Sequence, residues 1–174
     1  MKRIIALLLC VGIFVVAAAG CTGKSTKKAV ATGDEAISTN AADYENNFKG
    51  LCTYLSALGY INPKEKNKGI TYSVMDAEII GASEGRRFVA QHTKNTVIEI
   101  YEYDLQALQS TPDEAATDVR ASVQKDNTFV NLVGETVKDA YLSDNGRFLM
   151  IYSGNDDSKE EVINNFKSFH ANDK

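Results

Sequence analysis

The chain has 174 residues, of which 44% are hydrophobic and 24% are charged, and its formal net charge is −4. This length is enough for one domain with a short additional segment. The acidic balance argues against nucleic acid as a partner, because domains that bind nucleic acid normally carry a basic patch.

The first 20 residues have the three-part pattern of a secretory signal. Lys2 and Arg3 precede an apolar run from Ile4 to Gly20, which ends in small residues. The run has 17 residues, at the lower limit of the roughly 17–25 that span a bilayer. Small residues stand where a stop-transfer flank would be, which favours a removable signal over the alternative of an uncleaved anchor.

The signal ends in Ala18-Ala19-Gly20-Cys21. This tetrapeptide resembles the lipobox of bacterial lipoproteins, with Ala18 at a position where leucine is commoner. The resemblance implies cleavage between Gly20 and Cys21 and a diacylglycerol on the Cys21 thiol. The mature chain is then expected outside the cytoplasm, bound to the cell membrane through that lipid.

Removal of the signal changes the charge and the cysteine count. Without Lys2 and Arg3 the mature chain has 17 basic and 23 acidic side chains, a net charge of −6. Cys10 leaves with the signal and Cys21 is acylated, so Cys52 is the only free thiol. No intramolecular disulfide is then possible, and the domain must be held by its apolar core.

Residues 22–42 contain little to bury and are expected to form, after the lipidated Cys21, a flexible tether. The domain itself is expected over residues 43–174. From Asp43, apolar residues at spacings of three and four predict a helix that Gly59 ends. Residues 71–82 fit either a short helix or a strand, and we favour the helix.

Residues 86–92 and 96–103 are rich in β-branched and aromatic side chains and predict a hairpin. The second strand has two apolar faces, Ile98 and Ile100 on one and Val97, Tyr101 and Tyr103 on the other. A strand of this kind is expected at the centre of a sheet, covered on more than one side.

The C-terminal half contains two capping boxes, each of which predicts the start of an amphipathic helix. They are Thr111-Pro112-Asp113-Glu114 and Ser158-Lys159-Glu160-Glu161. Strands are expected between them at 128–133, 136–142 and 147–153, with a tight turn at Asn145-Gly146.

This order predicts an α+β domain of two layers, an antiparallel sheet of four or five strands with helices packed mainly on one face. Residues 86–125 and 136–170 form a candidate ββα–ββα pseudo-repeat. The stretches AEIIGASEGRRF and VIEIYEYD are similar to those of small uncharacterised bacterial lipoproteins, a resemblance that implies no function.

Glu99 and Glu102 alternate with Tyr101 and Tyr103, a candidate carboxylate-and-aromatic surface for a cation, a sugar or a peptide. Solvated charges at a strand end are the alternative that we favour. Arg86 and Arg87 are suited to binding an anion, or are simply solvated.

His92 and His170 stand in no zinc-binding pattern, and no motif marks a nucleophile or a cofactor loop. We therefore expect no metal, no cofactor and no catalytic residues. The expected function is a non-enzymatic binding module of the cell envelope, with an envelope protein or a small ligand as partner.

The alternative function is a small envelope hydrolase that uses carboxylates near Glu99 and Glu102. Two convergent carboxylates in a deep pocket, or His92 beside an acid and a hydroxyl, would argue for this enzyme and against a function in binding alone. An exposed apolar patch would instead favour a protein partner.

Overall fold

Two strands with apolar side chains on both faces form the centre of a five-stranded antiparallel sheet. They are β3 (Val97–Glu102) and β7 (Phe148–Ser153), and the strand order is β1-β2-β3-β7-β6. The outer strands are β1 (Tyr72–Val74), β2 (Glu84–Val89) and β6 (Ala140–Leu142). The α+β class, the sheet and the central position of β3 are therefore confirmed.

The structure, a computed structural model, describes residues 37–62, 72–93 and 95–173. The expected signal, the expected acylation site Cys21 and most of the expected tether lie outside these residues. Within the described part, regular structure is already present in the last residues of the expected tether. The 3-10 helix η1 spans Ala41–Asp43, and the Tyr44 hydroxyl donates to the Ser38 carbonyl at 2.5 Å.

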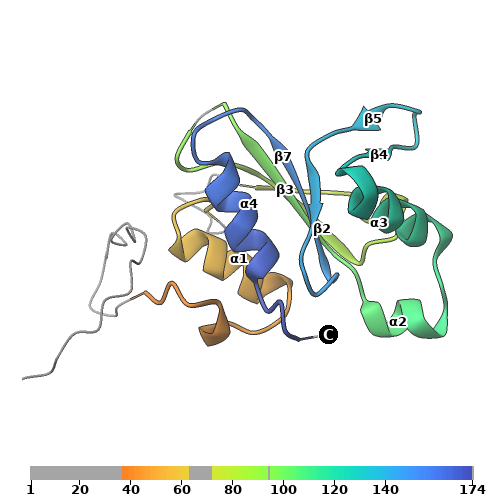
Figure 1. Ribbon diagram of the computed structural model, residues 1–174, viewed down its shortest axis with the longest axis horizontal. Coiled ribbons are helices and arrows are strands. Elements are labelled where there is room, and N and C mark those ends of the chain that lie inside the picture. Colours follow the sequence, from red (N-terminus) through yellow and green to blue (C-terminus); the bar gives the residue numbers. More distant parts are fainter. Residues whose placement is uncertain (1–36, 63–71, 94, 174) are drawn as a thin grey trace, which may run out of the picture.

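Helices cover both faces of the sheet, which differs from the expected packing mainly on one face (Figure 1). α1 (Phe48–Ala57) and α4 (Lys159–Ser168) pack against the face that carries Ile98 and Ile100. α3 (Glu114–Asp126) packs with η2 (Glu78–Ile80) against the face of Tyr101, Leu149 and Ile151. Since both faces of β3 and β7 are apolar, one layer of helices would leave one face in water.

The two halves of the candidate pseudo-repeat do not form a repeat in space. Each has its hairpin, β2–β3 and β6–β7, and the two hairpins meet at the antiparallel β3–β7 pair. However, α3 follows the first hairpin onto one face, and α4 follows the second onto the other. Two antiparallel neighbouring strands are exchanged by a two-fold axis perpendicular to the sheet, and this rotation leaves each face of the sheet on its own side. It therefore cannot superpose α3 on α4, because these helices lie on opposite faces.

Several boundaries shift because a different side chain caps the helix. α1 begins after Asn47, whose side chain accepts from the Gly50 N–H at 2.8 Å, and Asp43 belongs to η1 instead. α3 begins after Asp113. Residues 72–80 contain both alternatives, the strand β1 and the short 3-10 helix η2. The short helix α2 (Leu105–Ser110), capped by Asp104, was not expected.

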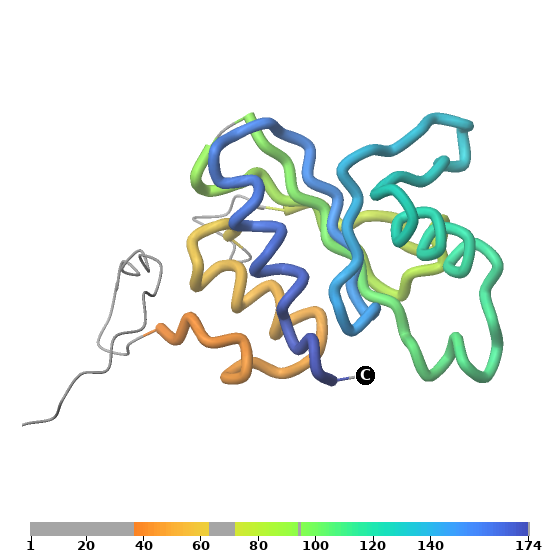
Figure 2. Tube along the Cα trace, in the orientation of Figure 1, coloured from red at the N-terminus to blue at the C-terminus, as the bar shows by residue number. Residues whose placement is uncertain are grey.

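A second, two-stranded sheet stands apart from the main one. β4 (Phe129–Val130) and β5 (Thr136–Val137) form a hairpin next to α3. Figure 2 shows this hairpin on the opposite side of the central sheet from α1 and from the segment that follows Ile37. The domain thus has a side joined to the expected tether and a side that carries the hairpin.

Candidate functional site

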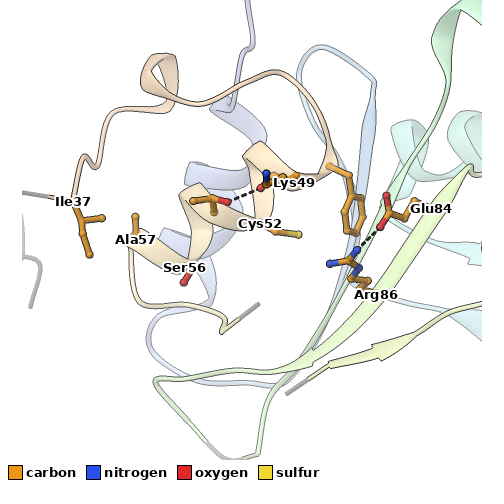
Figure 3. Close-up of a pocket in the computed structure, with 9 residues that line it drawn as sticks. Ile37, Lys49, Cys52, Ser56, Ala57, Glu84 and Arg86 are labelled. Atoms are coloured by element: carbon orange, nitrogen blue, oxygen red, sulfur yellow. Dashed lines mark hydrogen bonds and ion pairs between the residues drawn. The ribbon is translucent and has the colours of Figure 1, made fainter. Parts of the chain in front are cut away.

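A groove lies between α1 and strand β2 (Figure 3). Its volume is about 560 Å³, within the range of roughly 300–1,000 Å³ typical of small-ligand pockets. Its apolar lining consists of Ile37, Phe48, Cys52 and Ala57. Phe48 and Cys52 are almost completely buried, so Ile37 and Ala57 provide the accessible apolar surface. The polar side chains around it are Lys49, Thr53, Ser56, Glu84 and Arg86. The groove therefore combines an apolar surface with a few charged groups.

Arg86 is the fixed charged group of this groove. Its guanidinium carbon lies 4.7 Å from the ring centre of Tyr72 and 5.2 Å from that of Phe48. Both distances suit cation–π contacts. Nη2 donates to Glu84 Oε1 at 2.7 Å, which is the one hydrogen bond of the Arg86 side chain to a described residue. A guanidinium has five N–H donors, so others are available to a ligand.

Cys52 belongs to the apolar lining and has no nucleophilic role there. Its side chain is buried in the core between the sheet and helices α1 and α4. Burial raises the pKa of the Cys52 thiol to about 12. Because the thiolate is the reactive form, this thiol is inert at neutral pH.

Glu99 and Glu102 lie on opposite faces of the sheet. Residues separated by three positions in a strand always do so, because side chains alternate with a period of two. Glu99 accepts from Arg87 Nε at 2.9 Å and from the Tyr101 hydroxyl at 2.8 Å. Glu102 accepts from Arg147 Nε at 2.7 Å. The two carboxylates are therefore not convergent.

Tyr101 and Tyr103 are buried in the core between the sheet and α3, with 5% and 0% of their surface exposed. They are packed beneath α3 instead of offering aromatic faces to a ligand. The structure thus does not bring the four residues of the candidate carboxylate-and-aromatic surface together on one exposed face. Of the neighbouring arginines, Arg86 faces the groove and Arg87 binds Glu99 on the opposite face.

Tyr103→Phe is expected to raise the free energy of unfolding by about 1 kcal/mol. The buried Tyr103 hydroxyl has no hydrogen-bond partner among the described residues, so its removal relieves a desolvation penalty. Tyr101→Phe is the matched control and should lower stability by about 1–2 kcal/mol, because it breaks the bond to Glu99. Chemical denaturation measures both, and the reverse order of the two variants would contradict this prediction.

His92 does lie beside an acid and a hydroxyl. Its Nε2 is 3.2 Å from Asp156 Oδ1 and 3.2 Å from the Tyr152 hydroxyl. Asp156 Oδ2 accepts from Tyr152 at 2.7 Å and from Thr96 Oγ1 at 2.6 Å. We call these four residues the His92–Asp156 cluster.

The hydroxyls of the His92–Asp156 cluster are directed into the protein. Thr96 and Tyr152 are almost completely buried, and both donate to the same carboxylate. Burial, followed by the hydrogen bond to Asp156, raises the pKa of Tyr152 above its ordinary value of 10. Neither hydroxyl is thus both accessible and activated for attack. In this geometry the cluster joins the β2–β3 turn to the loop before α4.

The β4–β5 hairpin exposes an apolar tip. Val130, Leu132 and Val133 are 64%, 74% and 77% exposed. They contribute little to either core, and exposed aliphatic groups of this kind suit a protein contact. This tip is separate from the groove, because it lies on the other side of the sheet.

Within the described residues, no group of three or more His, Cys, Asp or Glu side chains is placed to hold a metal ion. None of the helices in that part of the chain is long and apolar enough to cross a membrane. Comparison of the chain with protein-family models, with curated proteins and with solved structures finds no match.

Proposed function

We propose that this protein is a lipid-anchored, extracytoplasmic binding module of the cell envelope, with the groove beside α1 as its ligand site. The signal-like N-terminus and its Ala18-Ala19-Gly20-Cys21 end support the anchor. The observation that carries the binding function is the groove itself, of ligand-pocket size, with an apolar lining and one arginine held in position.

The groove lies on the tethered side of the domain. Ile37, which lines it, follows the lipidated Cys21 by 16 positions. A flexible chain of this length spans about 20 Å root-mean-square. The proposed anchor therefore holds the ligand site near the membrane surface, where amphiphilic molecules concentrate.

The hydrolase alternative has less support. It requires two carboxylates that converge near Glu99 and Glu102, and these two side chains lie on opposite faces of the sheet. The His92–Asp156 cluster offers no accessible hydroxyl in their place. We therefore favour binding without catalysis.

Cys21→Ser is expected to abolish lipid attachment completely, since no other thiol stands at the signal end. Cells that express each variant are labelled with a fatty-acid analogue, and the chain is followed by fluorescence and membrane fractionation. Cys10→Ser, which changes a thiol inside the signal, is the matched control and should retain the label. Retention of the label by Cys21→Ser, or membrane retention with an intact N-terminus, would contradict the proposed anchor.

A further inference from the structure

We propose that the groove binds a small amphiphile whose anionic head, a carboxylate or a phosphate, pairs with Arg86 and whose apolar chain lies against Ile37 and Ala57. This inference rests on the proposed function and names the ligand class of the same site. It follows from the chemistry of the two parts of the groove.

The guanidinium of Arg86 is the reason for proposing an anionic head group. Its faces lie against the rings of Tyr72 and Phe48, so its N–H groups remain at the edge. One of them binds Glu84, and the side chain is still 29% exposed. The planar guanidinium fork matches carboxylate and phosphate oxygens, which it binds with two parallel hydrogen bonds.

The local charge also favours an anion. Lys49 and Arg86 contribute two positive charges to the groove and Glu84 one negative charge, a net charge of +1. The whole chain has a net charge of −4. The groove is therefore a cationic site on an acidic protein, and complementary charge gives such a site its specificity.

The apolar lining of the groove is the reason for proposing that the ligand also has an apolar chain. A free inorganic anion would leave the accessible apolar atoms of the groove, such as those of Ile37, in contact with water. A purely apolar ligand would cover Arg86 without offering it an acceptor, which is costly for a charged group. A molecule with an anionic head and an apolar chain satisfies both parts.

The test uses residues 21–174 with Cys21→Ser, which contain every described element of both cores. Octanoate, octyl phosphate and octyl glucoside share one chain length and differ in the head, and acetate and inorganic phosphate have the heads alone. Calorimetric titration below the micelle concentration is expected to give at least tenfold tighter binding of octanoate and octyl phosphate than of octyl glucoside. Acetate and phosphate alone should not bind at these concentrations.

Variants assign the binding to the groove. Arg86→Gln should weaken binding of the two anionic amphiphiles at least tenfold. Arg87→Gln, one residue away on the opposite face, should leave it unchanged. Ala57→Trp, which fills the groove, should abolish binding of all amphiphiles, whereas Ala121→Trp on the exposed side of α3 should not. Circular dichroism checks that each variant is folded, and Lys49→Gln replaces Arg86→Gln if the latter unfolds.

Different results would contradict the anionic head group and the groove as a ligand site. Equal binding of octyl glucoside and octanoate, abolished by Ala57→Trp, would overturn the anionic head and keep the groove as a ligand site. Equal losses in Arg86→Gln and Arg87→Gln would also overturn the role of Arg86. Absence of binding by every probe would overturn both this inference and the proposed ligand site, while the lipid anchor is judged separately by Cys21→Ser.

Discussion

Phe88→Ala is expected to lower the free energy of unfolding by about 3–5 kcal/mol. The Phe88 side chain is fully buried in the core beneath α1, opposite Ile98 of β3. Its ring centre lies 5.8 Å from that of Tyr72. Alanine leaves a cavity between sheet and helices that these close-packed neighbours cannot fill. Denaturant unfolding followed by circular dichroism measures the loss.

Val89→Ala is the matched control, because Val89 is the next residue of β2 and its side chain is 56% exposed. Its effect is expected within about 0.5 kcal/mol of zero. Equal losses in the two variants would mean that β2 does not have the register with β3 described above. The comparison thus tests the central sheet as well as one side chain.

Asp156→Ala is expected to lower the free energy of unfolding by about 2–4 kcal/mol, because buried hydroxyls lose a charged acceptor. The hydroxyls are those of Thr96 and Tyr152. The variant should also release the β2–β3 turn, with faster amide exchange there. Asp157→Ala, an exposed neighbour of equal charge, is the control and should change stability little.

The contribution of Asp156 depends on pH in a defined direction. Burial alone would raise the pKa of this carboxyl, but hydrogen bonds from Thr96, from Tyr152 and from the Ser158 N–H outweigh it. The charge of His92 acts in the same sense, and the pKa falls below its ordinary value of 3.8. The stabilisation is therefore complete above pH 3.8 and is lost as the pH falls through the folded-state pKa. A stability difference between wild type and Asp156→Ala that grows in acid would contradict this account.

The central sheet could be predicted because the distribution of apolar side chains along each strand indicates which of its faces are buried. The two apolar faces of β3 indicate cover on both sides, and the structure has α1 and α4 on one face and α3 on the other. Two apolar faces require cover on both sides, and helices mainly on one face would not provide it. The cap at Asp113 was also available from the sequence, but the capping box placed the start of α3 two residues earlier.

The candidate site depends on contacts between residues that are far apart in the sequence, and only part of it could be predicted. Alternation alone separates Glu99 from Glu102, so their divergence was predictable from the spacing. Arg86 was identified as suited to an anion, but not its groove, because Ile37, α1 and β2 meet only after folding. The His92–Asp156 cluster likewise joins residues 60 or more positions apart, such as Thr96 and Asp156. No local pattern predicts such contacts.

The most direct test of the proposed lipid-anchored module is the intact mass of the protein purified from its own membrane. We expect a chain that begins at Cys21, carries the mass of a diacylglyceryl group on that residue and lacks residues 1–20. A chain that retains residues 1–20, or one that begins at Cys21 without added mass, would contradict it.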